Sequence, residues 1–175
     1  MKNIILLFFI LAFTSCATFK TDSLSENRQV LSKNDLKKFE GTFGGVSKDT
    51  LSIGLHYLVN ENSPNKERFA ERYKVDLKLI DKNHLQMELY RDTTRIKSKI
   101  LKFKVRRDYL FIKKFVEVNT YIFATGTRVT NTRICLSKNG NLIADMAELQ
   151  IAFLLIAPFV DRKTEYYGLE FERIE

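Results

Sequence analysis

Hydrophobic and polar residues alternate along the stretch from Tyr73 to Lys114, and this pattern predicts two successive β-hairpins. In the first hairpin every second residue is apolar on both sides of a turn at residues 81–84: Tyr73, Val75, Leu77 and Leu79, then Leu85, Met87 and Leu89. A period of two is typical of strands with one face in a core and the other in water. The second hairpin has Leu101, Phe103 and Val105, a turn at Arg107-Asp108, and a return run from Tyr109 to Ile112. Strands joined by such short turns are antiparallel neighbours.

The first sixteen residues have a different pattern, that of a targeting segment. Lys2 precedes an apolar run from Ile4 to Phe13, which small polar residues separate from Cys16. The run is too short to span a membrane as a helix. A charged start, a short apolar region and a small residue before a cysteine resemble a bacterial lipoprotein signal. This resemblance implies that residues 1–15 are removed and that Cys16 carries a lipid; a plain secretory signal or a buried apolar N-terminus is the alternative.

Residues 16–31 are polar and without a period, so we interpret them as a flexible tether. Residues 32–175 then make up about one domain. If Cys16 carries lipid, Cys135 has no disulfide partner, because the chain has only two cysteines. Residues 17–20 lack the acidic cluster that resembles a surface-export tag in some lipoproteins. We therefore expect an exported protein, anchored to the outer membrane and facing the periplasm.

The domain begins with a helix signal and a short aromatic motif. Residues 32–35, Ser-Lys-Asn-Asp, resemble a capping box and predict a short helix through Lys38. Gly41-Thr42-Phe43 follows. A helical turn before a Gly-x-aromatic motif resembles the lipocalin-like barrels, which have tryptophan where Phe43 stands. The resemblance implies a last-strand arginine that stacks on this aromatic ring and closes the barrel; Arg173 is the candidate, and an ordinary exposed arginine is the alternative.

The segment from residue 49 to residue 60 fits two templates equally well. Leu51, Leu55, Leu58 and Val59 share one face of a helix, whereas Leu51, Ile53, Leu55 and Tyr57 alternate as in a strand. Periodicity does not decide between them. The resemblance to lipocalin-like barrels implies a lid over the barrel mouth here, a place that a short helix would suit.

The second half of the chain predicts further strands. Residues 115–132 suggest one edge strand or a bulged strand. Residues 133–137 and 142–146 flank Asn139-Gly140, a strong hairpin signal, and the last strand turns Tyr167, Leu169 and Phe171 inward. We therefore predict an all-β protein, an antiparallel meander that closes into a lipocalin-like barrel of about eight to ten strands, with a short N-terminal helix and possibly a lid helix.

Residues 151–160 form an uninterrupted apolar run, half the length needed to span a bilayer as a helix. One interpretation is a buried strand followed by a proline-turned loop that packs under the barrel. The other is a rim loop that contacts lipid or a partner.

No set of residues specifies a reaction. His56 and His84 have no second ligand at metal-binding spacing, and no phosphate-binding loop or nucleophile elbow is present. Cys135 has no identifiable base, and it either faces outward or marks a different register. We expect no enzyme activity, no metal and no cofactor.

Charge is concentrated in one region of a chain whose net charge is +8. Between Arg95 and Lys114 there are nine basic residues and one acid, and Lys102, Lys104 and Arg106 share a strand face. We call these three residues the basic face. A solvated outer surface is one interpretation, and docking on anionic lipid headgroups is the other. Nucleic acid is not expected as a partner, because the protein is exported and the basic face has no stacking aromatics on its own strand face.

Two classes of function follow. The first is a binding module that holds a small apolar or lipid-like ligand in the barrel, with these candidate contacts: Leu55, Tyr57, Tyr73, Leu77, Met87 and Phe103. The second is an envelope interaction protein with a filled barrel, which contacts a partner or anionic lipid through its loops and basic face. In both classes the lipid on Cys16 attaches the chain to the membrane.

Overall fold

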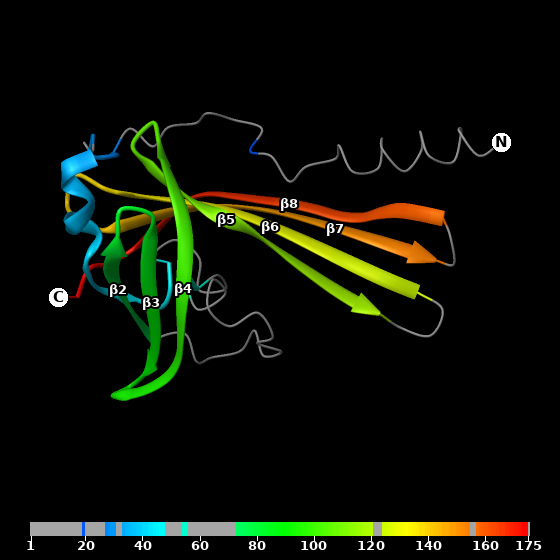
Figure 1. Ribbon diagram of the computed structural model, residues 1–175, viewed down its shortest axis with the longest axis horizontal. Coiled ribbons are helices and arrows are strands. Elements are labelled where there is room, and N and C mark those ends of the chain that lie inside the picture. The colour runs from blue at the N-terminus through cyan, green and yellow to red at the C-terminus, as the bar shows by residue number, and fades with distance from the viewer. Residues whose placement is uncertain are drawn as a thin grey trace. The chain divides into compact units, whose positions relative to one another are not determined.

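The computed structural model describes residues 19, 27–30, 33–47, 54–55, 73–120, 124–154 and 157–174 (Figure 1). These residues fall into two compact units. The larger unit contains the described residues from 27 to 113, from 132 to 145 and from 167 onward. The smaller unit contains Phe19 and the described residues within 114–131 and 146–166.

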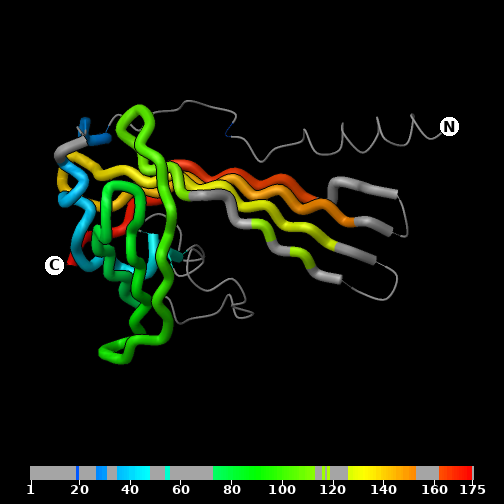
Figure 2. The backbone as a smooth tube through the Cα atoms, viewed as in Figure 1, coloured from blue at the N-terminus to red at the C-terminus, as the bar shows by residue number. Residues whose placement is uncertain are grey.

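The described elements are one 3-10 helix and eight strands. They are η1 (Lys33–Phe39), β1 (Gly41–Gly44), β2 (Tyr73–Asp81), β3 (His84–Arg91), β4 (Thr94–Arg106), β5 (Tyr109–Thr120), β6 (Ala124–Leu136), β7 (Leu142–Leu154) and β8 (Ala157–Phe171). The strands form one sheet in sequential order, and Figure 2 shows this meander as a continuous path. The predicted all-β antiparallel meander is confirmed.

Both predicted hairpins have the expected register. Leu77 on β2 lies opposite Met87 on β3, and Phe103 on β4 lies opposite Ile112 on β5. Arg107 and Asp108, between β4 and β5, have positive φ angles of 50° and 64°. A two-residue turn with positive φ at both residues has a backbone twist that matches the right-handed twist of the strands that it connects.

The inward residues of the larger unit form its core. Each of the following is at most 2% exposed: Phe39, Phe43, Leu77, Leu85, Met87, Leu89, Phe103, Leu110, Ile134, Leu136 and Phe171. Lys78 and Lys104, which alternate with core residues, are exposed. Since burial of apolar side chains is the main stabilising term in folding, this inner face holds the larger unit together.

The expected N-terminal helix is present only as a 3-10 helix, η1. Leu36 and Phe39, three residues apart, are both buried, as the three-residue turn of a 3-10 helix permits. No lid helix occurs among the described residues. Of residues 49–60 only Gly54 and Leu55 are described: Gly54 bridges Val46, and the Leu55 amide donates to the Gly45 carbonyl at 3.1 Å. The rest of the expected lid lies outside the described residues.

Two other expectations need correction. Residues 115–132 are not one strand: they contain the end of β5 and the beginning of β6. The connecting sequence, Tyr-Ile-Phe at 121–123, has no Gly, Pro or Asn to signal a turn. The apolar run 151–160 contains the end of β7 and the beginning of β8, so Pro158 lies in a strand and not in a loop.

Candidate functional site

The residues predicted as ligand contacts are already packed. Leu55, Leu77, Met87 and Phe103 are each at most 2% exposed. Tyr73 is half-buried, and Tyr57 lies outside the described residues. Leu77 and Met87 face each other across β2 and β3. The structure therefore places the four buried candidates in the core, where side chains of the protein contact them.

The first strand pairs with the chain just beyond the last one. Phe43 on β1 forms an antiparallel bridge with Arg173. The Gly44 amide donates to the Glu172 carbonyl at 2.8 Å, and the Ile174 amide donates to the Thr42 carbonyl at 2.8 Å. These bonds connect the two ends of the sheet within the larger unit, as closure of a curled sheet requires.

Arg173 contributes its side chain to the same contact. Its guanidinium carbon lies 4.9 Å from the centre of the Phe43 ring. The guanidinium also donates to the carbonyls of Gly140 at 3.0 Å, of Glu40 at 2.9 Å and of Lys38. The structure thus contains the arginine–aromatic contact that the lipocalin resemblance implies, and it adds bonds to the end of η1 and to the β6–β7 turn.

Gly41 allows β1 to begin directly after η1. Its φ angle of 148° is one that residues with a Cβ atom rarely adopt. Gly41 pairs with Leu77 on β2, so the strand ladder starts at this residue. The Gly-x-aromatic motif therefore has a backbone role at Gly41 and a packing role at Phe43.

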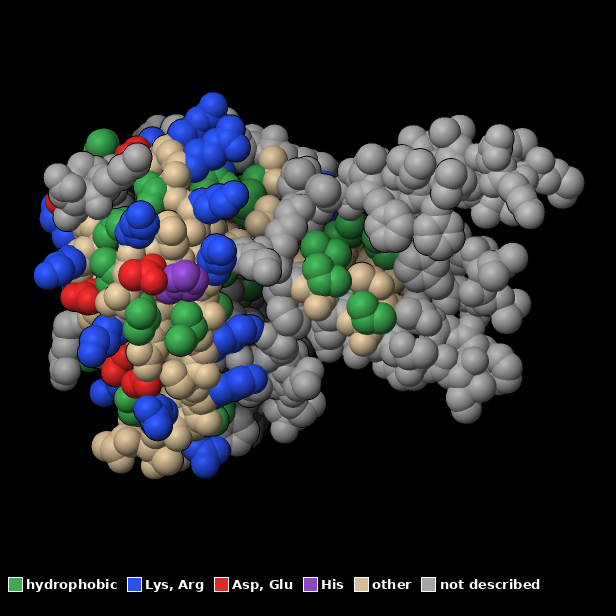
Figure 3. All heavy atoms as spheres, in the orientation of Figure 1, with side chains coloured by type: hydrophobic (Ala, Val, Ile, Leu, Met, Phe, Trp, Pro, Cys, Tyr) green, Lys and Arg blue, Asp and Glu red, His purple; other side chains and the backbone are tan. Residues whose placement is uncertain are grey.

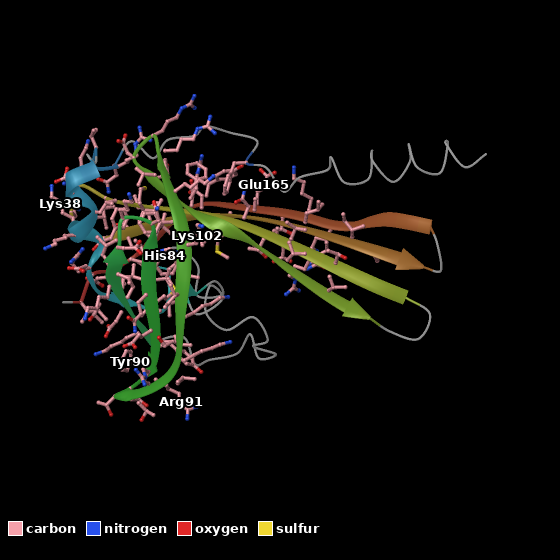
Figure 4. All side chains as sticks on the ribbon, in the orientation of Figure 1. Lys38, His84, Tyr90, Arg91, Lys102 and Glu165 are labelled. Carbon is pink, nitrogen blue, oxygen red and sulfur yellow. The ribbon has the colours of Figure 1, made fainter. Side chains whose placement is uncertain are left out.

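The basic face lies on β4, on the side of the strand opposite to the core. Lys102, Lys104 and Arg106 are exposed. Lys102 lies directly across from His84 on β3, and Figure 4 shows these two residues on neighbouring strands. Within the described part of the chain the three cations of the basic face have no hydrogen bond or ion pair. Figure 3 shows lysine and arginine side chains gathered on this surface of the larger unit.

The acids on neighbouring strands are engaged with other residues. Glu88 accepts hydrogen bonds from Tyr90 at 2.8 Å and from Arg95 at 3.0 Å, and these bonds lower the pKa of its carboxyl group. Asp81 accepts from the Asn83 amide at 2.7 Å and contacts His84 Nδ1 at 2.8 Å, and both bonds lower the Asp81 pKa. Each carboxylate is therefore held in its charged form by partners other than the basic face.

A second part of the outer side, over β5, β6 and β7, is buried. Tyr109, Cys135 and Ile143 pack together there and are at most 2% exposed, with Phe111 against them. Burial raises the pKa of the Cys135 thiol to about 12. Cys135 thus faces away from the main core, as one of the two interpretations held, yet it is a packed and unreactive thiol.

A buried ion pair lies on this covered side. Arg133 Nε and Asp145 Oδ2 are 2.7 Å apart, and each side chain is only 3% exposed. Asp145 Oδ1 accepts the Gly168 amide at 2.7 Å, and the Arg133 guanidinium lies 4.6 Å from the centre of the Tyr109 ring. With these additional contacts the buried charge pair is satisfied, and its contacts connect residues of four strands, β5, β6, β7 and β8.

Residues 27–29, part of the stretch interpreted as a tether, pair with the end of β6. The Gln29 amide donates to the Leu136 carbonyl and the Lys138 amide donates to the Asn27 carbonyl, both at 2.8 Å. Arg28 lies 5.5 Å from the Tyr109 ring centre and 3.8 Å from the Asp108 carboxylate. Sequence reasoning missed Arg28, because a lone arginine in a polar stretch gives no periodic signal.

Other expectations concern residues that the structure does not place or chemistry that it does not show. Cys16 lies outside the described residues. Within the described ranges, no three His, Cys, Asp or Glu side chains gather as a metal site would require. In the same part of the chain, no helix has the length and apolar character needed to cross a membrane.

No protein-family model matches the chain, and neither a curated protein nor a solved structure is similar enough to count as a match. The lipocalin resemblance therefore depends on the motifs and strand order of this chain alone.

Proposed function

We propose that this protein is a lipid-anchored protein of the bacterial cell envelope whose lipocalin-like barrel is filled by its own side chains. It acts by docking the basic face on anionic lipid headgroups. The observation that carries the proposal is the row of three exposed cations, Lys102, Lys104 and Arg106, without an acidic partner among the described residues. Each basic residue near an anionic surface adds about 1 kcal/mol of attraction.

The place where the predicted tether joins the larger unit supports docking through the basic face. Eleven residues lie between Cys16 and Arg28. If they form the tether that the sequence predicts, its end-to-end distance is roughly 20 Å. Arg28 contacts Asp108, two residues beyond Arg106 on the chain. A lipid on Cys16 would thus keep the basic face close to the bilayer, which raises its effective concentration there.

The packed interior favours this function over a binding module. An eight-stranded barrel is just wide enough either to be filled by side chains or to hold one small ligand. Because Leu55, Leu77, Met87 and Phe103 are almost fully buried, a ligand would have to displace side chains that are already part of the core.

Vesicle binding tests the docking. The chain from Ala17 onward, which contains every described residue and no lipid, should bind phosphatidylglycerol vesicles and dissociate as salt rises, because exposed charges are screened over roughly 10 Å at 0.1 M. Reversing Lys102, Lys104 and Arg106 to Glu should abolish binding. The matched control reverses Lys37, Lys138 and Arg162, which are also exposed, and should reduce binding much less. Equal losses in the two variants would reject the basic face.

Ligand displacement tests the alternative. Under the proposal, a fluorescent fatty acid should show no saturable binding, and native mass spectrometry should show no bound mass. Saturable binding that Met87→Trp weakens would favour the binding module instead.

Metabolic labelling with a fatty acid tests the anchor. Label is expected on the full-length chain, and Cys16→Ser should remove it. Label that persists in Cys16→Ser would contradict the assignment of the lipid to Cys16.

A further inference from the structure

One side of β4 is a feature of the larger unit that the proposed function does not use. β4 pairs with β3 from Thr94 to Lys102, and Figure 1 shows the two strands side by side. The register of β4 with β5 covers four pairs, from Phe103 to Arg106. Among the described residue pairs, the first part of β4 therefore has a neighbouring strand on one side. We call the other side of residues 96–100 the open edge.

The backbone groups of Ser98 and Ile100 point toward the open edge. The Phe103 amide donates to the Asn83 carbonyl in the turn between β2 and β3 at 2.8 Å, so the backbone groups of Phe103 point to the β3 side. Successive residues of an antiparallel ladder present these groups to opposite sides. The register is regular from residue 97 to residue 102, so Ser98 and Ile100 present their N–H and C=O groups away from β3.

Positive charge lies on both faces of β4 along the open edge. From Arg95 to Lys102 the sequence contains four cations and no acid. Lys97 shares a face of β4 with the buried Leu101, and Lys102 lies on the opposite face; both lysines are exposed. A strand added at this edge would therefore have a cation beside it on either face.

The side chains at the open edge favour an acidic peptide over a second copy of the chain. Pairing of two open edges would place their lysines beside each other, and like charges on neighbouring strands are destabilising. Lysines on edge strands also discourage such self-pairing. Ile100 is 61% exposed, so an aliphatic side chain of an added strand could pack against it across the strands.

We propose that the open edge binds an extended, acidic segment of a partner protein, which adds to the sheet as a strand antiparallel to β4. Hydrogen bonds to the backbone of Ser98 and Ile100 provide affinity. Charge attraction to Lys97 and contact with the Ile100 side chain select the segment. This binding needs no lipid, so it does not depend on the proposed docking of the basic face.

Fluorescence anisotropy of a labelled peptide tests the proposal without vesicles. The probe alternates glutamate and valine over about eight residues, so that as a strand it has its glutamates on one face and its valines on the other. The chain from Ala17 onward should bind this peptide and release it as salt rises. A peptide of alternating lysine and valine should bind at least roughly tenfold more weakly. No binding of the glutamate peptide, or equal binding of both peptides, would overturn the proposal.

Methylation of the peptide backbone separates strand addition from attraction by charge alone. With the valines on the face of Ile100, the valine amides face β4 and the glutamate amides face away. N-methylation of the valine amides should therefore weaken binding roughly tenfold, as expected for lost hydrogen bonds. N-methylation of the glutamate amides should have little effect. Equal binding of the two methylated peptides, or the reverse order, would reject antiparallel strand addition.

Substitutions at the open edge test the site from the side of the protein. Because the Ser98 amide points away from β3, Ser98→Pro removes a donor of the open edge and no hydrogen bond to β3, and it should weaken peptide binding roughly tenfold. Ser98→Ala keeps the amide and should change binding less than about twofold. Lys97→Glu should reverse the preference between the two peptides, whereas Lys78→Glu, at an exposed lysine of β2, should not. Equal binding by the Pro and Ala variants would exclude the open edge as the site.

Amide hydrogen exchange gives a readout on the unsubstituted chain. The glutamate peptide should slow exchange of the Ser98 and Ile100 amides, which gain acceptors, and should leave the Leu101 amide, which points to β3, unchanged. Protection of Ser98 and Ile100 that rises with protein concentration without peptide would show self-pairing and overturn the acidic peptide as the occupant. Intact peptide binding with no binding to vesicles would contradict the proposed function alone.

Discussion

The outer side of the sheet differs between two regions of the larger unit. Over β4 the cations Lys102 and Lys104 are exposed to solvent. Over β5–β7 the charged pair Arg133 and Asp145 is buried, together with Cys135. Both regions lie on strands whose other face packs into the main core, so position in the strand does not distinguish them. The difference comes from residues 27–29, which contact only the second region: they pair with the end of β6, and Arg28 lies over Tyr109.

This comparison shows that a charged residue on an outward strand face has no fixed energetic role. An exposed ion pair contributes about 0–1 kcal/mol, whereas removing one partner of a buried pair costs about 3–5 kcal/mol. The same residue types are thus exposed to solvent in one region and are part of a second, smaller core in the other.

The largest expected effect is at the buried ion pair. Asp145→Ala leaves Arg133 buried without its partner and removes the acceptor of the Gly168 amide, so the free energy of unfolding should fall by about 3–5 kcal/mol. Denaturant titration measures this loss. The control is Arg95→Ala, which breaks the pair with Glu88 at 3.0 Å; the Arg95 side chain is 60% exposed, so the loss should be less than about 1 kcal/mol. Similar losses at both sites would remove the distinction between the two regions.

The main core should respond almost as strongly. Leu77→Ala deletes a side chain that is 2% exposed and should lower the free energy of unfolding by about 2–5 kcal/mol. Lys78→Ala, one residue further on the same strand, should change it by less than about 0.5 kcal/mol. If the two variants lost equal stability in thermal or denaturant unfolding, β2 would be covered on both faces, as β6 is.

Closure of the sheet should contribute an intermediate amount. Arg173→Ala removes three guanidinium hydrogen bonds and the contact with Phe43, so we expect a loss of about 2–3 kcal/mol. Arg173→Lys keeps the charge but not the planar fork and should restore less than half of the loss. Full recovery by lysine would show that charge alone holds the two ends of the sheet.

The smallest effect concerns the cover over Cys135. Because burial raises the thiol pKa to about 12, the native protein should react with a thiol reagent at pH 8 only through transient opening. Arg28→Ala removes the cation above Tyr109 and should accelerate labelling about fivefold, equivalent to about 1 kcal/mol. Lys138→Ala, an exposed lysine of the nearby β6–β7 turn, should leave the labelling rate unchanged. An unchanged rate in Arg28→Ala would mean that Arg28 is not part of the cover.

The local pattern of residues was enough to predict the all-β class, the two central hairpins and the Asn-Gly hairpin, because a period of two and short polar turns are local properties. It also indicated Phe43 and Arg173 as partners, through the resemblance of two short motifs. Prediction failed where local signals are missing, because the β5–β6 connection has no turn residue. Alternation also left open whether Cys135 faces outward or marks a different register; it faces away from the main core and is buried.

Which candidate residues remain accessible depends on packing between distant parts of the chain. In the sequence, Leu77 and Met87 fit a ligand pocket as well as they fit a packed core. In the structure they lie opposite each other and are buried, so they belong to the core. Lys104 and Arg133 look alike in the sequence, yet one is exposed and the other is paired with Asp145. Availability depends on contacts between residues that are far apart in the chain, and alternation along one strand carries no information about them.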